Sequence, residues 1–180
     1  MNDEQRAWIR AARFGDPEAF ARLVESYKDH LFRTAYAIVR DRGEAEDVVQ
    51  EAFVKAYLTL PGLKDERAFS AWITTITTRL ALDWIRRRRP NVRLEDSDAA
   101  VQTDHRAMPA MKAELRIDLA DALAKLSPEH RTVIALREIQ GFDYQEMADI
   151  LGIPIGTVRS RLHHARLQLR RLLSSHEERG

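Results

Sequence analysis

QEMADILGIPIGTVRSRLHHAR, residues 145–166, is the stretch that decides the fold of the C-terminal part of this chain. Its hydrophobic spacing predicts a short helix over 145–151 and a second helix from Ile155 onward. Between them, Gly152-Ile153-Pro154 has the composition of a turn. Two helices joined by so short a turn must cross at a steep angle.

Four residues support this geometry. Ala148 is small, as required where two helices approach closely. Gly152, four residues later, can adopt the left-handed conformation that ends the first helix. Val158 and Leu162 then point back into the angle between the helices. This spacing is typical of a helix-turn-helix and predicts binding to duplex DNA.

The second helix is expected to expose a basic and polar face. The segment from Ile150 to His176 holds five arginines and no carboxylate. Arginine can donate two hydrogen bonds to a guanine edge or neutralise a phosphate. A merely solvated basic helix is the alternative, and charge alone would favour it, but the turn chemistry favours DNA. The residues expected on this face are Thr157, Arg159, Ser160, Arg161, His163, His164 and Arg166.

Composition limits the class of protein. The chain of 180 residues has 29 basic and 28 acidic side chains and a net charge of +1, so separate basic and acidic surfaces can serve different partners. It has no cysteine, which excludes disulfides, thiolate metal sites and cysteine nucleophiles. No apolar run approaches the roughly 20 residues of a membrane span, and the N-terminus lacks a signal-peptide core. We therefore expect a soluble, cytoplasmic protein.

Helix signals dominate the chain, and strand signals are nearly absent. Asp16-Pro17-Glu18 and Ser127-Pro128-Glu129 are both typical helix starts, and Asp143 to Glu146 has the spacing of a capping box. After the first start, apolar residues recur at helical spacing. They are Phe20, Leu23, Val24, Tyr27, Leu31 and Ala35.

Interruptions of this pattern divide the chain. Breaks are expected at Arg42-Gly43 and at Leu60-Pro61-Gly62, followed by a long helix over 68–89 that Pro90 ends. Residues 91–112 are polar and aperiodic, which is typical of a flexible linker. We predict an all-α chain with two small helical domains, residues 1–90 and 113–180, on either side of this linker.

An acidic helix is expected between the two breaks. The segment DVVQEAFVKAY, residues 47–57, and the residues just before it carry carboxylates at positions 44, 46, 47 and 51. Such a helix is either an ordinary solvated surface or a docking face for a basic partner.

The next helix combines aromatic, hydroxyl and basic side chains. Aromatic residues at helical spacing are usually core, and Ile73, Ile76, Leu80 and Trp84 are expected there. Aromatic platforms beside cations also suit single-stranded bases, which stack on the rings while their phosphates are neutralised. The residues expected along this other face are Trp72, Thr75, Arg79, Asp83, Arg86 and Arg87.

Catalytic signatures are absent from the sequence. There is no phosphate loop or dinucleotide fingerprint, and the six histidines form no metal pattern. Asp47 and Glu51, one helical turn apart, would make a poor Mg²⁺ site on an exposed helix. We therefore expect no enzymatic activity, no cofactor and no metal.

The order of these features carries a resemblance. An acidic DxxQEAFxxAY helix, a short loop, an FxxW basic helix, a linker and a helix-turn-helix ending GTVRSRLHHAR resemble an extracytoplasmic-function sigma factor of the sigma-70 family. The resemblance covers roughly residues 10–173. It implies two helical domains, regions two and four, that bind core RNA polymerase and direct it to promoters.

The resemblance also implies roles for particular residues. Asp47, Gln50, Glu51 and Phe53 match the helix that docks on the coiled coil of the largest polymerase subunit. Arg159, Ser160 and Arg161 match residues that read the minus-thirty-five element, with Thr157, His163, His164 and Arg166 on the same helix. The residues that match the part opening the minus-ten element are Lys64, Arg67, Phe69, Trp72, Thr75, Arg79, Asp83, Arg86 and Arg87.

The linker and its surroundings complete this expectation. The linker would thread toward the RNA exit path, where the acidic run at 95–98 would mimic nucleic acid. Family members are commonly held inactive by an anti-sigma factor, and we expect one here. One position departs from the family pattern, because His164 stands where many members have arginine, and a neutral imidazole cannot make arginine's bidentate guanine contact.

Two other functions compete with this one. A free-standing helix-turn-helix regulator would bind DNA without polymerase, but it has no need for the acidic helix. An interaction protein, such as an anti-sigma factor or adaptor, would use its basic helices to bind acidic partners. Only a sigma factor restores promoter-specific initiation to core polymerase.

Overall fold

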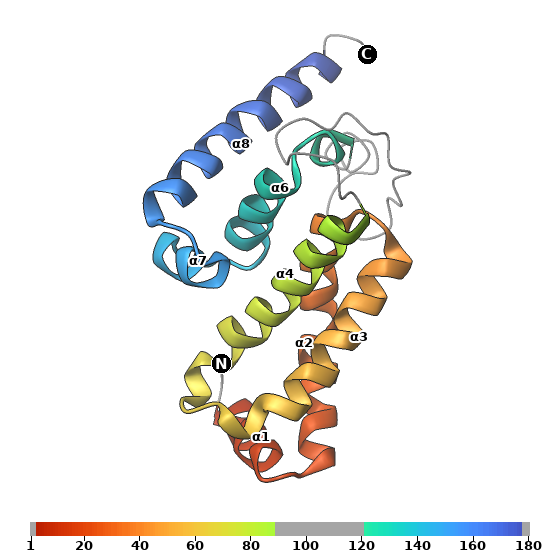
Figure 1. Cartoon of the computed structure of the whole chain (residues 1–180), viewed down its shortest axis with the longest axis vertical. Coiled ribbons are helices and arrows are strands. Elements are labelled where there is room, and N and C mark those ends of the chain that lie inside the picture. Colours follow the sequence, from red (N-terminus) through yellow and green to blue (C-terminus); the bar gives the residue numbers. More distant parts are fainter. Residues whose placement is uncertain (1–2, 89–120, 178–180) are drawn as a thin grey trace.

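A computed structural model describes residues 3–88 and 121–177, and helices joined by short connections make up this part of the chain (Figure 1). No β-strand occurs within these two ranges. The predicted all-α class is therefore confirmed. The expected linker, its acidic run and Pro90 lie outside the described residues.

The N-terminal unit consists of helices that pack side by side. Its elements are α1 (Asp3–Arg13), α2 (Pro17–Val39), α3 (Arg42–Thr59), the 3₁₀ turns η1 (Leu60–Gly62) and η2 (Glu66–Ala68), and α4 (Phe69–Arg88). The α2 helix starts as predicted, with the Asp16 carboxylate accepting from the backbone N–H of Glu18 at 2.9 Å and of Ala19 at 3.1 Å. The predicted stripe of α2 faces the core, where Leu23 and Leu31 are fully buried.

The first break in the pattern lies earlier than predicted. Arg40 adopts the left-handed conformation with φ 62°, and Asp41 caps α3 by accepting from the N–H of Glu44 at 3.0 Å. Arg42-Gly43, expected to interrupt the helix, therefore forms the first turn of α3. The left-handed residue is an arginine, a residue type that rarely adopts this conformation, and for this reason the sequence pattern predicted the boundary too late.

The C-terminal unit contains α6 (Pro128–Ile134), a π-helical turn η4 (Ala135–Ile139), α7 (Tyr144–Leu151) and α8 (Ile155–Glu177). The predicted start at Ser127 is confirmed, because its hydroxyl accepts from the N–H of His130 at 3.2 Å. The capping box at Asp143 is confirmed in both directions, with Glu146 as the partner.

The helix-turn-helix has the geometry that its sequence predicts. Gly152 is left-handed with φ 66°, and its N–H donates to the carbonyl of Ala148 at 2.8 Å. Val158 and Leu162 are buried at the angle between α7 and α8, together with Ala165. One side of α8 is thereby fixed against the core, and the opposite side faces outward.

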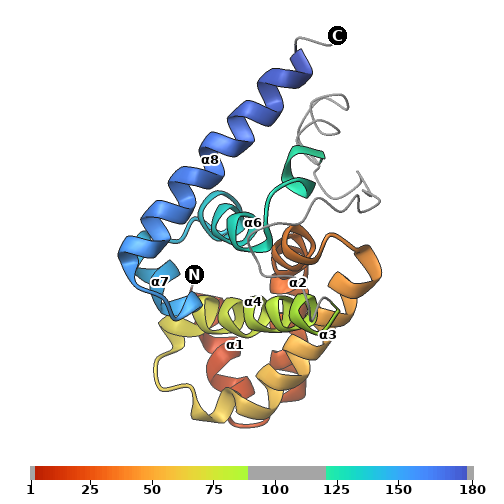
Figure 2. The same cartoon turned by 45° about the horizontal axis from the view of Figure 1, so that its top comes forward.

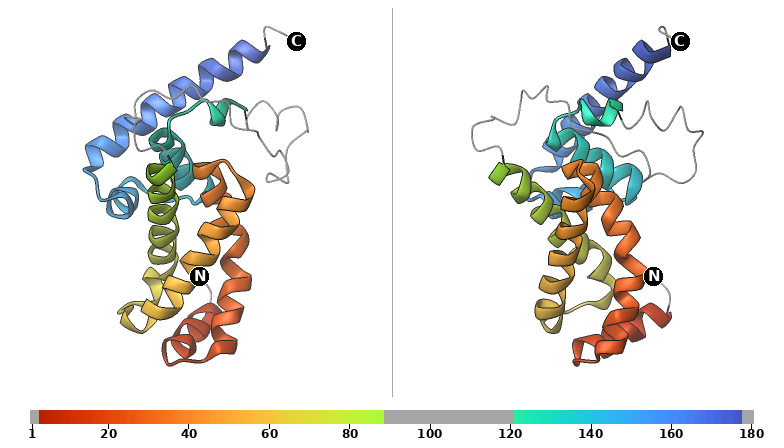
Figure 3. Two further views of the ribbon diagram at one scale, coloured as in Figure 1. Left: turned by 45° about the vertical axis from the view of Figure 1, so that its right-hand side comes forward. Right: turned by 90° about the vertical axis from the view of Figure 1, so that its right-hand side faces the viewer.

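The two units pack against each other. Helices α6 and α7 lie between the N-terminal unit and α8, which crosses on the outside (Figures 1 and 2). In both views of Figure 3, α8 (dark blue) lies on the side of α6 and α7 that is turned away from the N-terminal unit. The last turns of α2 are buried on all sides, since Thr34 to Val39 contact the N-terminal core on one side and α6 and η4 on the other.

Candidate nucleic-acid interface and docking face

The outer side of α8 carries the predicted DNA-contacting residues. Arg159, Ser160, His163, His164 and Arg166 are exposed, and Thr157 and Arg161 are partly exposed. Because an α-helix turns about 100° per residue, Arg159 and Arg161 lie about 160° apart around the axis. They occupy opposite flanks, with Ser160 between them.

The Arg159 flank is supported by the first helix of the motif. The Arg159 guanidinium lies over the Tyr144 ring, with Cζ 5.9 Å from the ring centre, and Arg137 lies 5.4 Å from the same centre. Arg166, seven residues after Arg159, pairs with Glu138 at 2.6 Å. Hydrogen bonding to this carboxylate raises the pKa of Arg166 above its ordinary value. Neither the contact with Tyr144 nor the contact with Glu138 could be predicted from the sequence, because each joins separate elements.

The middle of this surface has hydrogen bonds of its own. The Ser160 hydroxyl donates to the carbonyl of Thr157 at 3.1 Å, and Nδ1 of His164 lies 2.8 Å from the carbonyl of Ser160. The rings of His163 and His164 contact each other edge to face at 5.6 Å. The outward side of α8 is thus partly preorganised.

A second surface lies on α3, where Asp47, Gln50 and Glu51 are exposed as predicted. The same helical face continues to Val54 and Leu58, which are 59% and 71% exposed. The side chains of both are apolar. The face, called the α3 face below, is therefore acidic at one end and apolar at the other.

Phe53 does not belong to this face. It is only 8% exposed and packs edge to face on Phe20 at 6.4 Å. Helical spacing places it with Val49, Ala52 and Ala56 on the buried side. The prediction that its side chain contacts a partner is corrected: Phe53 holds α3 against the core.

The acidic residues of α3 differ in their partners. Glu44 accepts from Nε1 of Trp84 at 2.5 Å and pairs with Arg88 at 3.1 Å, so it ties α3 to α4. Glu51 pairs with Lys55 at 3.0 Å. Asp47 has no ion-pair partner within residues 3–88 and 121–177. It is therefore the carboxylate on the α3 face that is best able to meet a basic partner.

The predicted minus-ten residues are divided between surface and core. Arg79 is exposed, Trp72 and Thr75 are partly exposed, and Thr75 donates to the carbonyl of Ala71 at 2.7 Å. Phe69 is fully buried and packs on Tyr27 at 5.2 Å. Its predicted role in contacting DNA is corrected, because its ring anchors the start of α4.

The basic end of α4 and the preceding loop are exposed. Asp83 pairs with Arg86 at 3.0 Å, and Nε of Arg87 donates to the carbonyl of Asp83 at 3.4 Å. In the loop, Lys64 is exposed, and so is Arg67. The loop therefore supplies exposed cations before the start of α4, and Arg86 and Arg87 supply exposed cations at its end.

The loop that carries Lys64 and Arg67 is held by one local contact and by one contact with α1, both made by residues 65–67. Arg67 donates to Asp65 from its backbone N–H at 2.9 Å and from Nε at 3.4 Å. Glu66 pairs with Arg10 of α1 at 2.9 Å, and this hydrogen bond lowers the pKa of Glu66. The sequence could not predict the second link, since the partners are distant in the chain.

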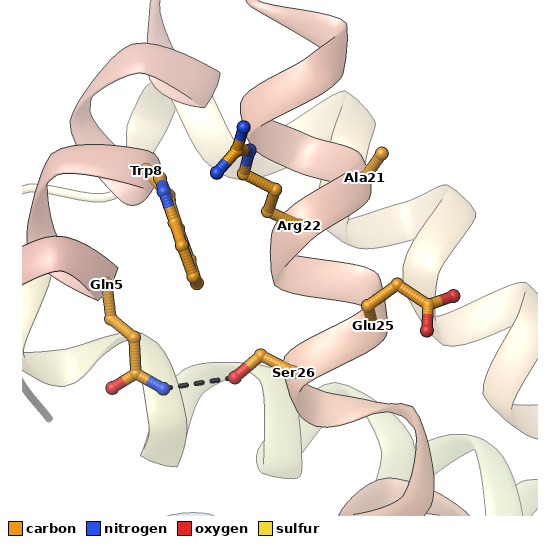
Figure 4. Close-up of a pocket in the computed structure, with 6 residues that line it drawn as sticks. All are labelled: Gln5, Trp8, Ala21, Arg22, Glu25 and Ser26. Carbon is orange, nitrogen blue, oxygen red and sulfur yellow. Dashed lines mark hydrogen bonds between the residues drawn. The ribbon is translucent and has the colours of Figure 1, made fainter.

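The described residues form one further hollow that could be considered as a ligand site. A hollow between α1 and α2 is lined by Gln5, Trp8, Ala21, Arg22, Glu25 and Ser26 (Figure 4). Its side chains engage one another, with Gln5 donating to Ser26 at 3.0 Å and Arg22 lying over Trp8. Among the described residues, no three histidine or acidic side chains come together to hold a metal ion.

Two family models match this chain. "Sigma-70 region 2" matches residues 23–90, which include the α3 face and α4, and "Sigma-70, region 4" matches residues 116–169, which include the helix-turn-helix. The class defined by fold and surfaces is thus that of sigma-70-type initiation factors.

Similarity to individual proteins identifies the chain more closely within this class. The chain is 34% identical to the ECF RNA polymerase sigma factor SigW of Bacillus subtilis, covering 92% of this chain and 94% of the relative. The structure of CnrH in complex with the cytosolic domain of CnrY is similar with a TM-score of 0.71 and 29% identity, over 96% of this chain and 99% of that one. The sigma factor RpoE in complex with the anti-sigma factor NepR from Bartonella quintana also gives a TM-score of 0.71 and 29% identity, over 86% and 96%.

The chain belongs to the extracytoplasmic function sigma factors of the sigma-70 family. It is accordingly a transcription initiation factor that binds core RNA polymerase and directs it to promoters. No helix in the described part of the chain is long and apolar enough to cross a membrane.

Proposed function

We propose that this sigma factor grips polymerase and promoter through three separate surfaces, and that it acts in the cytoplasm without catalysing a reaction itself. Residues 1–90 would form the polymerase-docking and minus-ten domain, 91–112 the linker, and 113–180 the minus-thirty-five domain. The observation that carries this proposal is the pairing of an exposed acidic-apolar face on α3 with an exposed basic face on α8.

Docking on polymerase is assigned to the α3 face. Asp47, Gln50 and Glu51 supply charge and hydrogen bonds, which steer encounter with a basic partner. Val54 and Leu58 supply apolar area next to them, and burial of such area is the main source of affinity. A coiled coil of the largest polymerase subunit, expected from the family resemblance, offers a helical surface of suitable shape.

The minus-ten element is assigned to α4 and the loop before it. Trp72 offers a partly exposed ring on which a base can stack, and Arg79, Arg86 and Arg87 offer cations for phosphates. Thr75 and Asp83 lie on the same side of the helix, and Lys64 and Arg67 add two exposed cations in the loop before it. Unstacking a base costs a few kcal/mol, which binding of the captured strand can offset without enzyme chemistry.

The minus-thirty-five element is assigned to α8. The buried side of α8 is held by the core, so its outer side can enter the major groove as a recognition helix. Arg159 and Arg166 would approach the DNA from one flank and Arg161 from the other. Thr157, Ser160, His163 and His164 lie between or beside them.

Regulation by an anti-sigma factor is part of the proposal. The two structural relatives described above are each named in complex with another protein, and one of these is named as an anti-sigma factor. A partner of this kind would act by covering the DNA-contacting and docking surfaces.

Run-off transcription with purified core polymerase tests the proposal. The wild-type chain should restore initiation at a defined start site, and a pull-down should show it bound to core. Asp47→Arg should abolish both. Glu46→Arg is the matched control, because Glu46 lies about 100° away around α3 and pairs with Arg42. If the wild type fails to bind core polymerase, the proposal is wrong and a free-standing regulator is favoured.

A further inference from the structure

The centre of the exposed face of α8 is formed by two side chains one helical turn apart, Ser160 and His164. Both are exposed, and both are hydrogen-bonded to backbone carbonyls of their own helix. They lie between the Arg159 and Arg166 flank on one side and Arg161 on the other. We call this pair the α8 centre.

The hydrogen bond of His164 fixes its tautomer. Nδ1 lies 2.8 Å from the carbonyl oxygen of Ser160, and a carbonyl oxygen can only accept. Nδ1 must therefore carry the proton of the neutral imidazole. Nε2, on the outer edge of the ring, is then left without a hydrogen and can only accept.

Ser160 is in the same situation. Its hydroxyl donates to the carbonyl of Thr157 at 3.1 Å, so its proton is directed back into the helix. The lone pairs of Oγ remain for a ligand in front of the helix. Two adjacent side chains thus present acceptor atoms outward, although serine and histidine can each act as donor in other settings.

Because the α8 centre presents acceptor atoms, it is better suited to contact a base edge than a phosphate. A phosphate needs donors, and the arginines on both flanks supply them. An acceptor facing a phosphate oxygen would be repelled. In the major groove, the groups that donate are the exocyclic amino groups, N4 of cytosine and N6 of adenine. Guanine and thymine present acceptors at the corresponding positions.

From this geometry we propose that Ser160 and His164 select a base with an exocyclic amino group, cytosine or adenine, at one position of the minus-thirty-five element. Arginine at position 164 would select guanine through its donors. His164 is thus a specificity-determining residue, and the arginines that flank it position the helix. This inference rests on the proposed binding of α8 to the minus-thirty-five element.

The experiment is selection of promoters by the holoenzyme from a library with a randomised minus-thirty-five element and a fixed minus-ten element. The wild type should enrich cytosine or adenine at one position. His164→Arg should shift that position to guanine, with a change of roughly tenfold in the base ratio, as expected for a bidentate contact. His164→Ala should lose the preference there while keeping the rest of the enriched sequence.

Ser174→Arg is the matched control. It adds the same guanidinium to an exposed position of α8, ten residues and about 15 Å beyond His164, so it should leave the preference at the His164-dependent position unchanged. Thermal unfolding of each variant separates loss of contact from loss of fold.

Three results would overturn the inference. The first is an enriched wild-type sequence that does not change in His164→Arg, which leaves the proposed function intact. The second is an equal loss of affinity for all sequences in His164→Ala with a smaller salt dependence, which marks a phosphate contact. The third is failure of the wild type to enrich any minus-thirty-five sequence, which removes the proposed function as well.

Discussion

Arg131 of α6 donates a hydrogen bond from Nη2 to the backbone carbonyl of Ile38 in α2 at 3.0 Å, and so joins the two units of the chain. Its Nη1 donates to the carbonyl of Leu126 at 2.8 Å, which holds the guanidinium in place. A second link comes from Gln140, whose Nε2 donates to the carbonyl of His30 at 3.2 Å and to the Thr34 hydroxyl. Specific hydrogen bonds therefore link the two units, in addition to the packing of Ala71 of α4 against the C-terminal core.

Such a closed arrangement has a consequence for promoter binding. A compact chain of 180 residues has a radius of gyration of about 16 Å. Elements centred about 25 base pairs apart are separated by about 85 Å along the DNA axis, at 3.4 Å per base pair. The two units must therefore separate before they can bind both elements together.

Weakening the contact should favour this opening. Gln140→Ala removes the donor to His30 and Thr34, and a net hydrogen bond contributes about 0.5–1.5 kcal/mol. We expect the open population to rise about fivefold or more. The chain has no cysteine, so cysteines introduced at Ala21 and Ser174 can be labelled specifically and their separation measured by energy transfer.

Gln145→Ala is the control for this measurement. Gln145 is exposed on α7 and bonds to Asp149, away from α2. An unchanged distance distribution in Gln140→Ala would show that this contact does not hold the units together.

Acidic pH should also favour opening, because His30 lies at the same contact. Burial and the nearby Arg33 guanidinium lower the pKa of His30 below its ordinary value of 6.5, against an opposing hydrogen bond with Gln140. Opening exposes the ring and returns its pKa toward 6.5, so the open form binds protons better. The stability of the closed form is full above pH 6.5 and falls as the pH drops below it.

The same energy-transfer pair, followed between about pH 8 and pH 5, measures this effect. His30→Gln should flatten the profile in the region below pH 6.5. A profile identical to that of the wild type would assign the pH dependence to another group.

Much of the fold could be predicted from short stretches of sequence. The predictions that failed depend on which side of a helix a residue faces or on contacts between distant residues. The caps at Asp16, Ser127 and Asp143 and the left-handed Gly152 depend on neighbouring residues alone, so the sequence suffices. Phe53 was assigned to docking from its place in a motif, but helical register places it on the buried side.

Contacts between residues that are distant in the sequence could not be predicted from neighbouring residues. Arg131 and Ile38 are 93 residues apart, and nothing near either one marks the other as its partner. The same holds for the ion pair of Glu66 with Arg10 and for the contacts that Tyr144 and Glu138 make with arginines of α8, because each joins residues that are distant in the sequence. The exposed residues of the candidate sites could be predicted, but the side chains that orient them could not.

Leu58 should contribute directly to docking. It is 71% exposed on the α3 face, so Leu58→Asp should leave the fold intact. Full burial of a leucine contributes about 1.5–3 kcal/mol, and its loss should weaken binding to core polymerase by roughly tenfold or more. A binding titration with labelled core polymerase measures this.

Phe14→Asp is the control for Leu58. Phe14 is 88% exposed but lies in the turn between α1 and α2, outside the α3 face. A loss in Phe14→Asp equal to that in Leu58→Asp would mean that docking is not confined to α3.

Tyr144 should affect specificity through Arg159. A cation over an aromatic ring contributes about 0.5–1 kcal/mol at an exposed site. Tyr144→Leu removes the ring beneath Arg159 and should reduce discrimination between minus-thirty-five sequences by about threefold, whereas Tyr144→Phe retains the ring and should restore it. A purely structural role would lower the thermal unfolding temperature in Tyr144→Leu without changing the ratio of affinities for cognate and altered promoters.

Arg159 and Arg161 should differ from Arg170 and Arg171 in the kind of binding that they support. The first two flank the outward centre of α8, where base edges are in reach, so Arg159→Ala and Arg161→Ala should each cost about 1–3 kcal/mol of promoter discrimination. The second two lie further along the exposed helix and should act through phosphate attraction, so their replacement lowers affinity for all sequences and reduces its salt dependence. Competition binding at several salt concentrations separates the two effects. Equal, sequence-independent losses for all four variants would show that α8 does not enter the major groove as proposed.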